Sequence, residues 1–290
     1  MRIANIAGRL ALIVDDTGVD VEKASHGKFS SDPQAIYEQW EAFVSWASSA
    51  SLPAGEAFDE RSLGSPVPAP RQVLAIGLNY REHAAESGFA VPDDPTVFTK
   101  YVSCITGPYT EVRLPEGQVD WEVELVAVIG KRAEHVPAAD AWSHLAGLTV
   151  GQDISERVTQ RQGPAPQFSL GKSFPGFGPI GPWLVTVDEF ADPDDLELGC
   201  AIDGEEMQKG RTSDLVFTVP QLIERLSAIL PLLPGDVILT GTPSGVGMGR
   251  SPQRFLKPGE ELVSYIEGIG QLRQRFIASP DLHPANEEVS

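Results

Sequence analysis

Two glutamates, Glu122 and Glu124, stand two residues apart in the segment VDWEVELVAVIG. Its alternating side chains, β-branched run and final glycine predict a strand over residues 119–130. Successive strand residues point to opposite faces, so Asp120 shares the face of the two glutamates. Like charges repel at this spacing, so the acidic face must lie in water or hold a positive group. The opposite face takes three apolar side chains: Trp121, Val123 and Leu125.

Carboxylates two residues apart on a strand form a rigid pair of ligands for a hard divalent cation such as Mg²⁺. A third ligand is expected from a neighbouring strand. Asp153 fits this role, because it stands where the apolar run of GLTVGQDIS ends. Taken alone, an E-x-E pattern is more often a solvated strand face, and the residues by themselves leave both interpretations open.

His83 and Glu86 stand three residues apart in NYREHAAESG, a segment of helical composition with Gly88 as its stop signal. On a helix they share one face. A carboxylate beside an imidazole orients the ring and favours its protonated form, and the pair can take a proton from water. An ordinary surface pair is the alternative interpretation.

Lys172 is a lone lysine among Gly, Pro and Phe in FSLGKSFPGFGPIGP. Apolar surroundings could lower its pKa, and a positive group there could stabilise an enolate or a carboxylate. A loop lysine in solvent is the alternative. The segment TGTPSGVG lacks the lysine and the spacing of a P-loop, and no G-x-G-x-x-G opens a helix after a strand, which excludes nucleotide binding.

Short apolar runs separated by turns predict a β-rich α+β fold, in keeping with 28 glycines and 24 prolines. We expect a small N-terminal α/β domain over residues 1–68 and a catalytic domain over residues 69–290, joined through the Pro-rich LGSPVPAPRQ. We also expect a hairpin at Asp203-Gly204, a helix over residues 218–229 and a loose tail from about Ser279.

The net charge of −19, from 41 acidic and 22 basic residues, argues against nucleic acid or an anionic membrane as a partner. No apolar run approaches the roughly 20 residues needed to cross a bilayer. The first residues lack the features of a signal peptide, so we expect a cytoplasmic protein. Cys104 and Cys200 belong to no metal or redox spacing, and we expect buried, reduced thiols.

In order along the chain, IGLNYREHAAESG, PTVFTKY, DWEVELVAVIG, GLTVGQDIS, GKSFPGFGPIGPWLV, GDVILTGTPSGVG and KPGEELVSYIEGIGQL resemble the fumarylacetoacetate hydrolase family. The resemblance covers about residues 73–276 and is strongest to the shorter bacterial and mitochondrial members that act on acylpyruvates and oxaloacetate. It implies a mixed β-roll catalytic domain, a homodimer, and Mg²⁺ or Mn²⁺ at the active site.

The resemblance also assigns roles to individual residues. His83 and Glu86 match the family's water-activating pair, carried on a lid that orders when substrate binds. Lys172 matches the lysine that reaches the reacting end of the substrate. The positions of the three metal carboxylates are Glu122, Glu124 and Asp153.

Positions that line the substrate pocket in relatives fall on Arg157, Gln160 and Thr242. Two motifs depart from the family pattern. Val158 and Thr159 replace a common Asp-Trp, and Pro175 replaces the aspartate of SFD or TFD. The departures leave the metal set and the His–Glu pair whole, so they bear on the choice of substrate.

A 2-oxo acid can chelate a metal ion through its carboxylate and 2-oxo oxygens. If the substrate has a second carbonyl at C4, the His83–Glu86 pair could activate water to attack it. Breaking the C3–C4 bond then leaves a pyruvate enolate for Lys172 to stabilise or protonate. We therefore predict a metal-dependent C–C hydrolase that cleaves a small anionic 2,4-dioxo acid, such as an acylpyruvate or fumarylpyruvate, to pyruvate and a carboxylic acid.

Other activities fit the same residues. Oxaloacetate decarboxylation gives the same enolate without water, and relatives also isomerise or dehydrate related 2-oxo acids. A non-enzymatic protein that only binds a small acid or a partner is a further alternative, although a broken metal set would be its expected signature.

Overall fold

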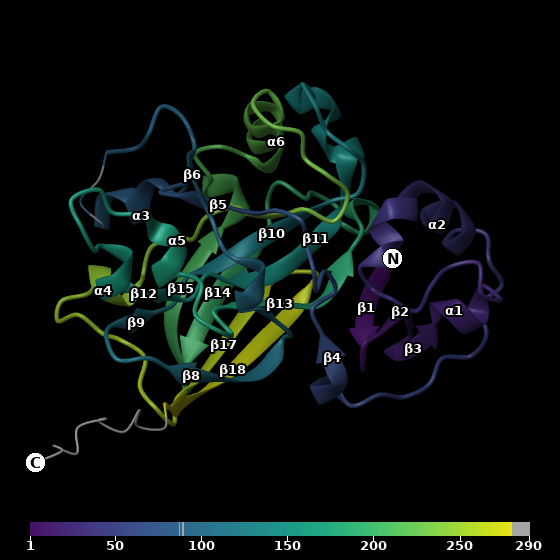
Figure 1. The fold of residues 1–290 in the computed structure, drawn as a ribbon, viewed down its shortest axis with the longest axis horizontal. Helices are drawn as coiled ribbons and strands as arrows, with labels where there is room; N and C mark the ends of the chain where they lie inside the picture. Colours follow the sequence, from purple (N-terminus) through teal and green to yellow (C-terminus); the bar gives the residue numbers. More distant parts are fainter. Residues whose placement is uncertain (87, 89, 280–290) are drawn as a thin grey trace, which may run out of the picture.

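The computed structural model describes residues 1–86, 88 and 90–279 (Figure 1). Two β-sheets pack against each other, and the largest of three hydrophobic clusters lies between them, with side chains such as Leu125 from one sheet and Leu262 from the other. The expected β-rich α+β fold is confirmed. The expected tail lies in residues 280–290, outside the described residues.

The large sheet runs in the order β3-β2-β1-β13-β11-β10-β16-β5-β6, with β4 paired to β1 and β7 paired to β13. Its strands are β1 (Arg2–Ile6), β2 (Arg9–Val14), β3 (Thr17–Asp20), β4 (Leu63–Gly64), β5 (Val73–Gly77), β6 (Thr96–Thr99), β7 (Ile105–Thr106), β10 (Val123–Ile129), β11 (Leu145–Gln152), β13 (Gly178–Val185) and β16 (Val237–Leu239).

The second sheet runs in the order β15-β14-β17-β18-β8, and two short strands, β12 and β9, pair separately. These strands are β8 (Tyr109–Leu114), β9 (Val119–Asp120), β12 (Ser155–Glu156), β14 (Glu197–Ile202), β15 (Glu205–Arg211), β17 (Glu261–Ile266) and β18 (Gly270–Ala278). The predicted hairpin joins β14 to β15, with Asp203 and Gly204 at φ 48° and 85°, the positive angles of a tight two-residue turn.

The α-helices are short and lie around the sheets: α1 (Val21–Ala24), α2 (Trp40–Ala47), α3 (Arg81–Glu86), α4 (Arg157–Gln160), α5 (Phe168–Gly171) and α6 (Val219–Ser227). Helix α6 lies within the predicted range 218–229 and begins with a capping box formed by Thr218 and Gln221. Helices α3, α4 and α5 gather on one side of the molecule, opposite the N-terminal strands (Figure 1).

The acidic segment is two strands and not the single strand that we predict from its alternation. β9 pairs with β12 and β10 pairs with β11 and β16, so the ladder breaks at Trp121 and Glu122. The Asp120 side chain accepts a hydrogen bond from the Trp121 amide at the break. The apolar face is confirmed, because Trp121, Val123 and Leu125 all pack into the largest cluster.

The N-terminal strands continue the large sheet. β1 pairs with β13 in antiparallel register, with Ile3 opposite Leu184, and the second hydrophobic cluster joins Phe43 of α2 to Val126 and Val128 of β10. The first residues therefore cover one face of the strand that carries Glu124. The domain boundary at residue 68 stays a prediction.

Within the described residues, no helix is both long and apolar enough to span a membrane. Both cysteines are free and buried, as expected.

Candidate active site

The acids Glu122, Glu124 and Asp153 come together in the interior. One ligand oxygen from each lies within 4.8 Å of the others, and the exposed fractions of the residues are 6%, 2% and 0%. Asp153 directly follows β11, and its amide donates to the carbonyl of Glu122 at 2.9 Å, which fixes the two acids against each other. The solvated-face interpretation is therefore wrong.

Two buried lysines neutralise Asp153. Lys172 Nζ bridges Asp153 Oδ2 at 2.6 Å and Glu122 Oε2 at 2.7 Å, while Lys100 Nζ binds Asp153 Oδ1 at 2.6 Å. Burial would lower the pKa of Lys172, but the charges of Asp153 and Glu122 raise the pKa overall. The expected lowering of this pKa is wrong, because the apolar segment places the ammonium group directly between carboxylates.

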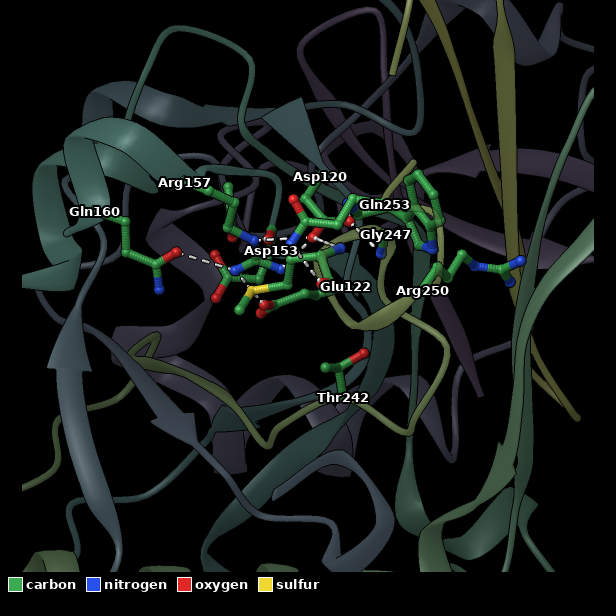
Figure 2. Close-up of polar contacts among 12 residues, drawn as sticks. Asp120, Glu122, Asp153, Arg157, Gln160, Thr242, Gly247, Arg250 and Gln253 are labelled. Atoms are coloured by element: carbon green, nitrogen blue, oxygen red, sulfur yellow. Dashed lines mark hydrogen bonds and ion pairs between the residues drawn. The ribbon is translucent and has the colours of Figure 1, made fainter. Parts of the chain in front are cut away.

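A buried guanidinium joins the remaining acids. Arg157 Nη1 lies 2.8 Å from Glu122 Oε1, and Arg157 Nη2 lies 2.8 Å from Asp120 Oδ2. Figure 2 shows Arg157 lying between Gln160 and these acids. Burial opposes ionisation of Glu122, but Lys172, Arg157 and, more weakly, His83 outweigh burial and hold its pKa below the usual range.

Glu124 has the opposite electrostatic environment. Within the described part of the chain it forms no ion pair, and Glu124 Oε2 accepts one hydrogen bond, 2.8 Å from the Gly241 amide. Burial, together with Asp153 and Glu122, raises its pKa well above the usual value. Gly241 has φ 103°, and a Cβ there would lie 2.7 Å from the Asn79 side chain, so the close approach of this amide requires glycine.

The donor set fits a hard divalent cation. Among the described residues, three of the acids (Asp120, Glu122 and Asp153) pair with three cations (Lys100, Arg157 and Lys172), and Glu124 pairs with none, so ionised Glu124 would add one excess negative charge. Three convergent carboxylates, one of them lacking a cationic partner, are the ligands that Mg²⁺ and Mn²⁺ prefer.

His83 and Glu86 form the expected pair on α3. His83 Nδ1 lies 2.8 Å from Glu86 Oε1, and the Gly245 amide donates to Glu86 Oε2 at 2.9 Å. His83 is 7% exposed, so the surface-pair interpretation is wrong for the imidazole. An acceptor carboxylate at Nδ1 fixes the ring as the tautomer that carries its proton there, which leaves Nε2 as the basic nitrogen.

A cavity of about 610 Å³ opens beside these groups. Seven predicted site residues line it: His83, Glu122, Glu124, Arg157, Gln160, Lys172 and Thr242. Asp153 and Glu86 stand behind them as partners of Lys172 and His83. Thr242 lies across from Arg157 (Figure 2), and its hydroxyl donates to the Val123 carbonyl at 2.8 Å. The structure thus brings all nine together, and their individual roles stay predictions.

Short elements hold the cavity walls. Lys172 caps the end of α5, and α4 carries Arg157 and Gln160. A Cβ at Gly171 would lie 2.6 Å from the Gln160 amide, so glycine lets α5 pack directly on α4. The substitutions at Val158 and Thr159 fall on α4, and Val158 points outward with 51% of its surface exposed.

Sequence reasoning missed Lys100 and left Asp120 without a definite role. Lys100 directly follows β6 in a segment with no chemical motif, and only the fold brings it to Asp153. Asp120 accepts hydrogen bonds from the Gly247 and Met248 amides as well as from Arg157. The available signal for Asp120 was its position two residues before Glu122, in the same alternation as Glu122 and Glu124.

Comparison with known proteins identifies the family. Residues 72–277 match the model of the fumarylacetoacetate (FAA) hydrolase C-terminal domain. The human mitochondrial oxaloacetate tautomerase FAHD2A is 46% identical over 215 residues, covering 73% of this chain and 68% of the human protein. The crystal structure of a Mycobacterium smegmatis protein described as HpcE has 57% identity and a TM-score of 0.94, covering 97% of this chain and all of that one.

A more distant structure bears on the metal. Maleylpyruvate hydrolase from Sphingobium sp. SYK-6, solved with manganese(II) and pyruvate, has 26% identity and a TM-score of 0.77, covering 97% of this chain and all of that one. The chain belongs to the fumarylacetoacetate hydrolase family, whose members include tautomerases and hydrolases. Because the human relative is mitochondrial by name, the cytoplasmic location stays a prediction.

Proposed function

We propose that this enzyme catalyses keto–enol proton transfer on a 2-oxo acid of the oxaloacetate type. The observation that carries the proposal is the pair on α3, in which Glu86 holds His83 by Nδ1 and leaves Nε2 as a base in the cavity wall. Tautomerisation needs such a base and a stabilised enolate. The 46% identity to the human oxaloacetate tautomerase supports this reaction.

His83 would take the proton from C3 of the keto acid to give the enolate, and the 2-oxygen would take up a proton from solvent to give the enol. In the reverse direction the enol would lose its O–H proton to solvent, and the His83 imidazolium would return a proton to C3. Glu86 stabilises the imidazolium that forms, because its carboxylate accepts a hydrogen bond from Nδ1–H throughout. The Gly245 amide holds Glu86 in place and keeps the ring oriented. A base of this kind contributes about 10²- to 10⁴-fold to the rate.

Lys172 would stabilise the negative charge that develops on the 2-oxygen. Its ammonium group has three donors, of which two are used by Glu122 and Asp153, so one is left for substrate. Glu122, Glu124 and Asp153 would hold Mg²⁺ or Mn²⁺, which when bound acts as a Lewis acid toward the carboxylate and 2-oxo oxygens.

C–C hydrolysis of a 2,4-dioxo acid is the second candidate. The same His83–Glu86 pair could deprotonate a water molecule, and a cavity of about 610 Å³ leaves room for a substrate larger than a four-carbon acid. Similarity to maleylpyruvate hydrolase supports this activity at a lower identity. The predicted acylpyruvate hydrolase therefore remains a proposal beside the tautomerase.

Purified protein with Mg²⁺ separates these reactions. Absorbance follows the conversion of enol-oxaloacetate to the keto form, and parallel assays with acetylpyruvate and fumarylpyruvate detect released pyruvate. We expect accelerated tautomerisation, slowed at least 100-fold in His83→Ala. Unchanged tautomerisation in that variant would contradict the proposed base, and pyruvate release without tautomerisation would favour the hydrolase. His144→Ala, at a half-buried histidine outside the cavity, is the matched control.

A further inference from the structure

Arg161 is a cavity-lining cation whose charge the protein does not neutralise. Arg157 and Lys172 line the same cavity, and both are bound by buried carboxylates. Among the described residues, Arg161 forms no ion pair. Its one side-chain contact of hydrogen-bond length joins Nη2 to Met248 Sδ at 3.3 Å. Thioether sulfur is a weak acceptor, so nearly all five guanidinium N–H donors remain available.

Arg161 and Arg157 lie at different depths of the cavity. Arg161 directly follows α4, four residues after Arg157, and both side chains line the cavity. Arg157 is 2% exposed and reaches inward to Glu122, whereas Arg161 is exposed to solvent. The two guanidinium groups therefore mark an inner and an outer part of the cavity.

The cavity also has apolar walls. Met248 contacts Arg161, and Pro166 and Phe168 are further apolar residues of the cavity lining. A guanidinium group recognises a carboxylate through two parallel hydrogen bonds, and apolar walls strengthen such a pair by excluding water. A monocarboxylic 2-oxo acid has no group to offer this cation when its carboxylate occupies the inner part.

We propose that Arg161 binds the distal carboxylate of a dicarboxylic 2-oxo acid whose 2-oxo end lies at Glu122, Glu124 and Asp153. Arg161 is then a specificity-determining residue that distinguishes diacids from monoacids of equal length. The orientation of the substrate rests on the proposed function, because that function places the 2-oxo end against the three carboxylates.

Two ligands of equal carbon number test the proposal. 2-Oxoglutarate has a distal carboxylate, and 2-oxopentanoate has a methyl group in its place. Isothermal titration calorimetry with the full chain and Mg²⁺ measures their dissociation constants. We expect the diacid to bind about 10- to 100-fold tighter, and we expect Arg161→Gln to remove most of this difference while binding of the monoacid stays the same.

Two further variants control for charge. Arg132→Gln makes the same change of net charge at an exposed arginine paired with Glu134 outside the cavity, and it should keep the full preference for the diacid. Arg161→Lys keeps a positive charge without the planar fork and should give an intermediate preference.

Equal affinities for the two ligands in the unmodified protein would overturn the proposal, and so would equal weakening of both ligands by Arg161→Gln. The binding measurement needs no turnover. A preference for the diacid without any tautomerisation of oxaloacetate would therefore reject the proposed function and keep the assignment of Arg161.

Discussion

Asp120 holds Arg157 in place beside Glu122, and Asp120→Asn removes its charge with little change of shape. Asp120 Oδ2 lies 2.9 Å from Arg157 Nε, and Oδ1 accepts from the Trp121 and Gly247 amides at 2.9 and 2.7 Å. Asparagine has one acceptor oxygen, and its amide group would face one of these sets of donors. The variant therefore leaves part of a buried cation uncompensated.

Removing one partner of a buried ion pair costs about 3–5 kcal/mol of unfolding free energy. Glu122 still compensates Arg157, so we expect a loss near the lower end, about 3 kcal/mol. At about 2–4 °C per kcal/mol for large domains, the melting temperature should fall by roughly 6–12 °C. Without Asp120, the guanidinium group of Arg157 would pair with Glu122 alone and would compete more strongly with a metal ion for this ligand. The affinity for Mn²⁺ should therefore also fall.

Urea unfolding followed by tryptophan fluorescence measures the change in unfolding free energy. The comparison requires that the free energy depend on urea concentration with a similar slope in Asp120→Asn and in the unmodified protein. Asp140→Asn, at an exposed acid outside the site, is the control and should change stability by less than about 0.5 kcal/mol. A loss below about 1 kcal/mol in Asp120→Asn would refute the argument that this acid compensates a buried charge.

Two further predictions concern α4 and the buried lysine. Glu156→Ala removes the carboxylate that caps α4 through bonds of 2.9 and 2.7 Å, and should cost about 1–2 kcal/mol near neutral pH. Burial would raise the pKa of Glu156, but these bonds lower it overall, so its stabilising effect is lost as pH falls through the lowered pKa. The difference in urea stability between variant and unmodified protein should therefore narrow below pH 4.5, and a pH-independent difference would contradict this. Lys172→Met removes the ammonium group that competes with a metal ion for Glu122 and Asp153; we expect Mn²⁺ to bind at least as tightly while tautomerisation slows about 100-fold or more. Weaker Mn²⁺ binding in calorimetry would show that the lysine supports the metal ligands instead.

Local sequence patterns predicted the elements that are determined by interactions between residues close together in the chain. The Asp203-Gly204 turn and the capped helix α6 lie where turn chemistry and apolar spacing put them. The break between β9 and β10 was missed, because alternation continues through Trp121 while the ladder partner changes from β12 to β11. Pairing partners far along the chain decide such breaks, and no local pattern encodes them.

The candidate site likewise contains residues that sequence motifs predict and residues that only the fold reveals. The order of its motifs placed the three carboxylates and the His83–Glu86 pair, but their spacing alone fits solvated surfaces equally well. Burial decides between these interpretations, and it comes from strands far apart in sequence. Lys100 reaches Asp153 across 53 residues, and Arg161 stands out only because the structure shows which cations of the cavity already have partners.

Mn²⁺ binding to the unmodified protein and to Glu124→Gln tests the central claim, that three buried carboxylates form one metal centre. Glu124 has no cation of its own among the described residues, so the substitution removes a ligand without leaving a lysine or arginine unpaired. Glu134→Gln, at an exposed acid, is the control. The account predicts one Mn²⁺ per chain in calorimetry, weakened at least about 10-fold by Glu124→Gln and unchanged in the control. Equal Mn²⁺ affinity in Glu124→Gln and the unmodified protein would contradict it.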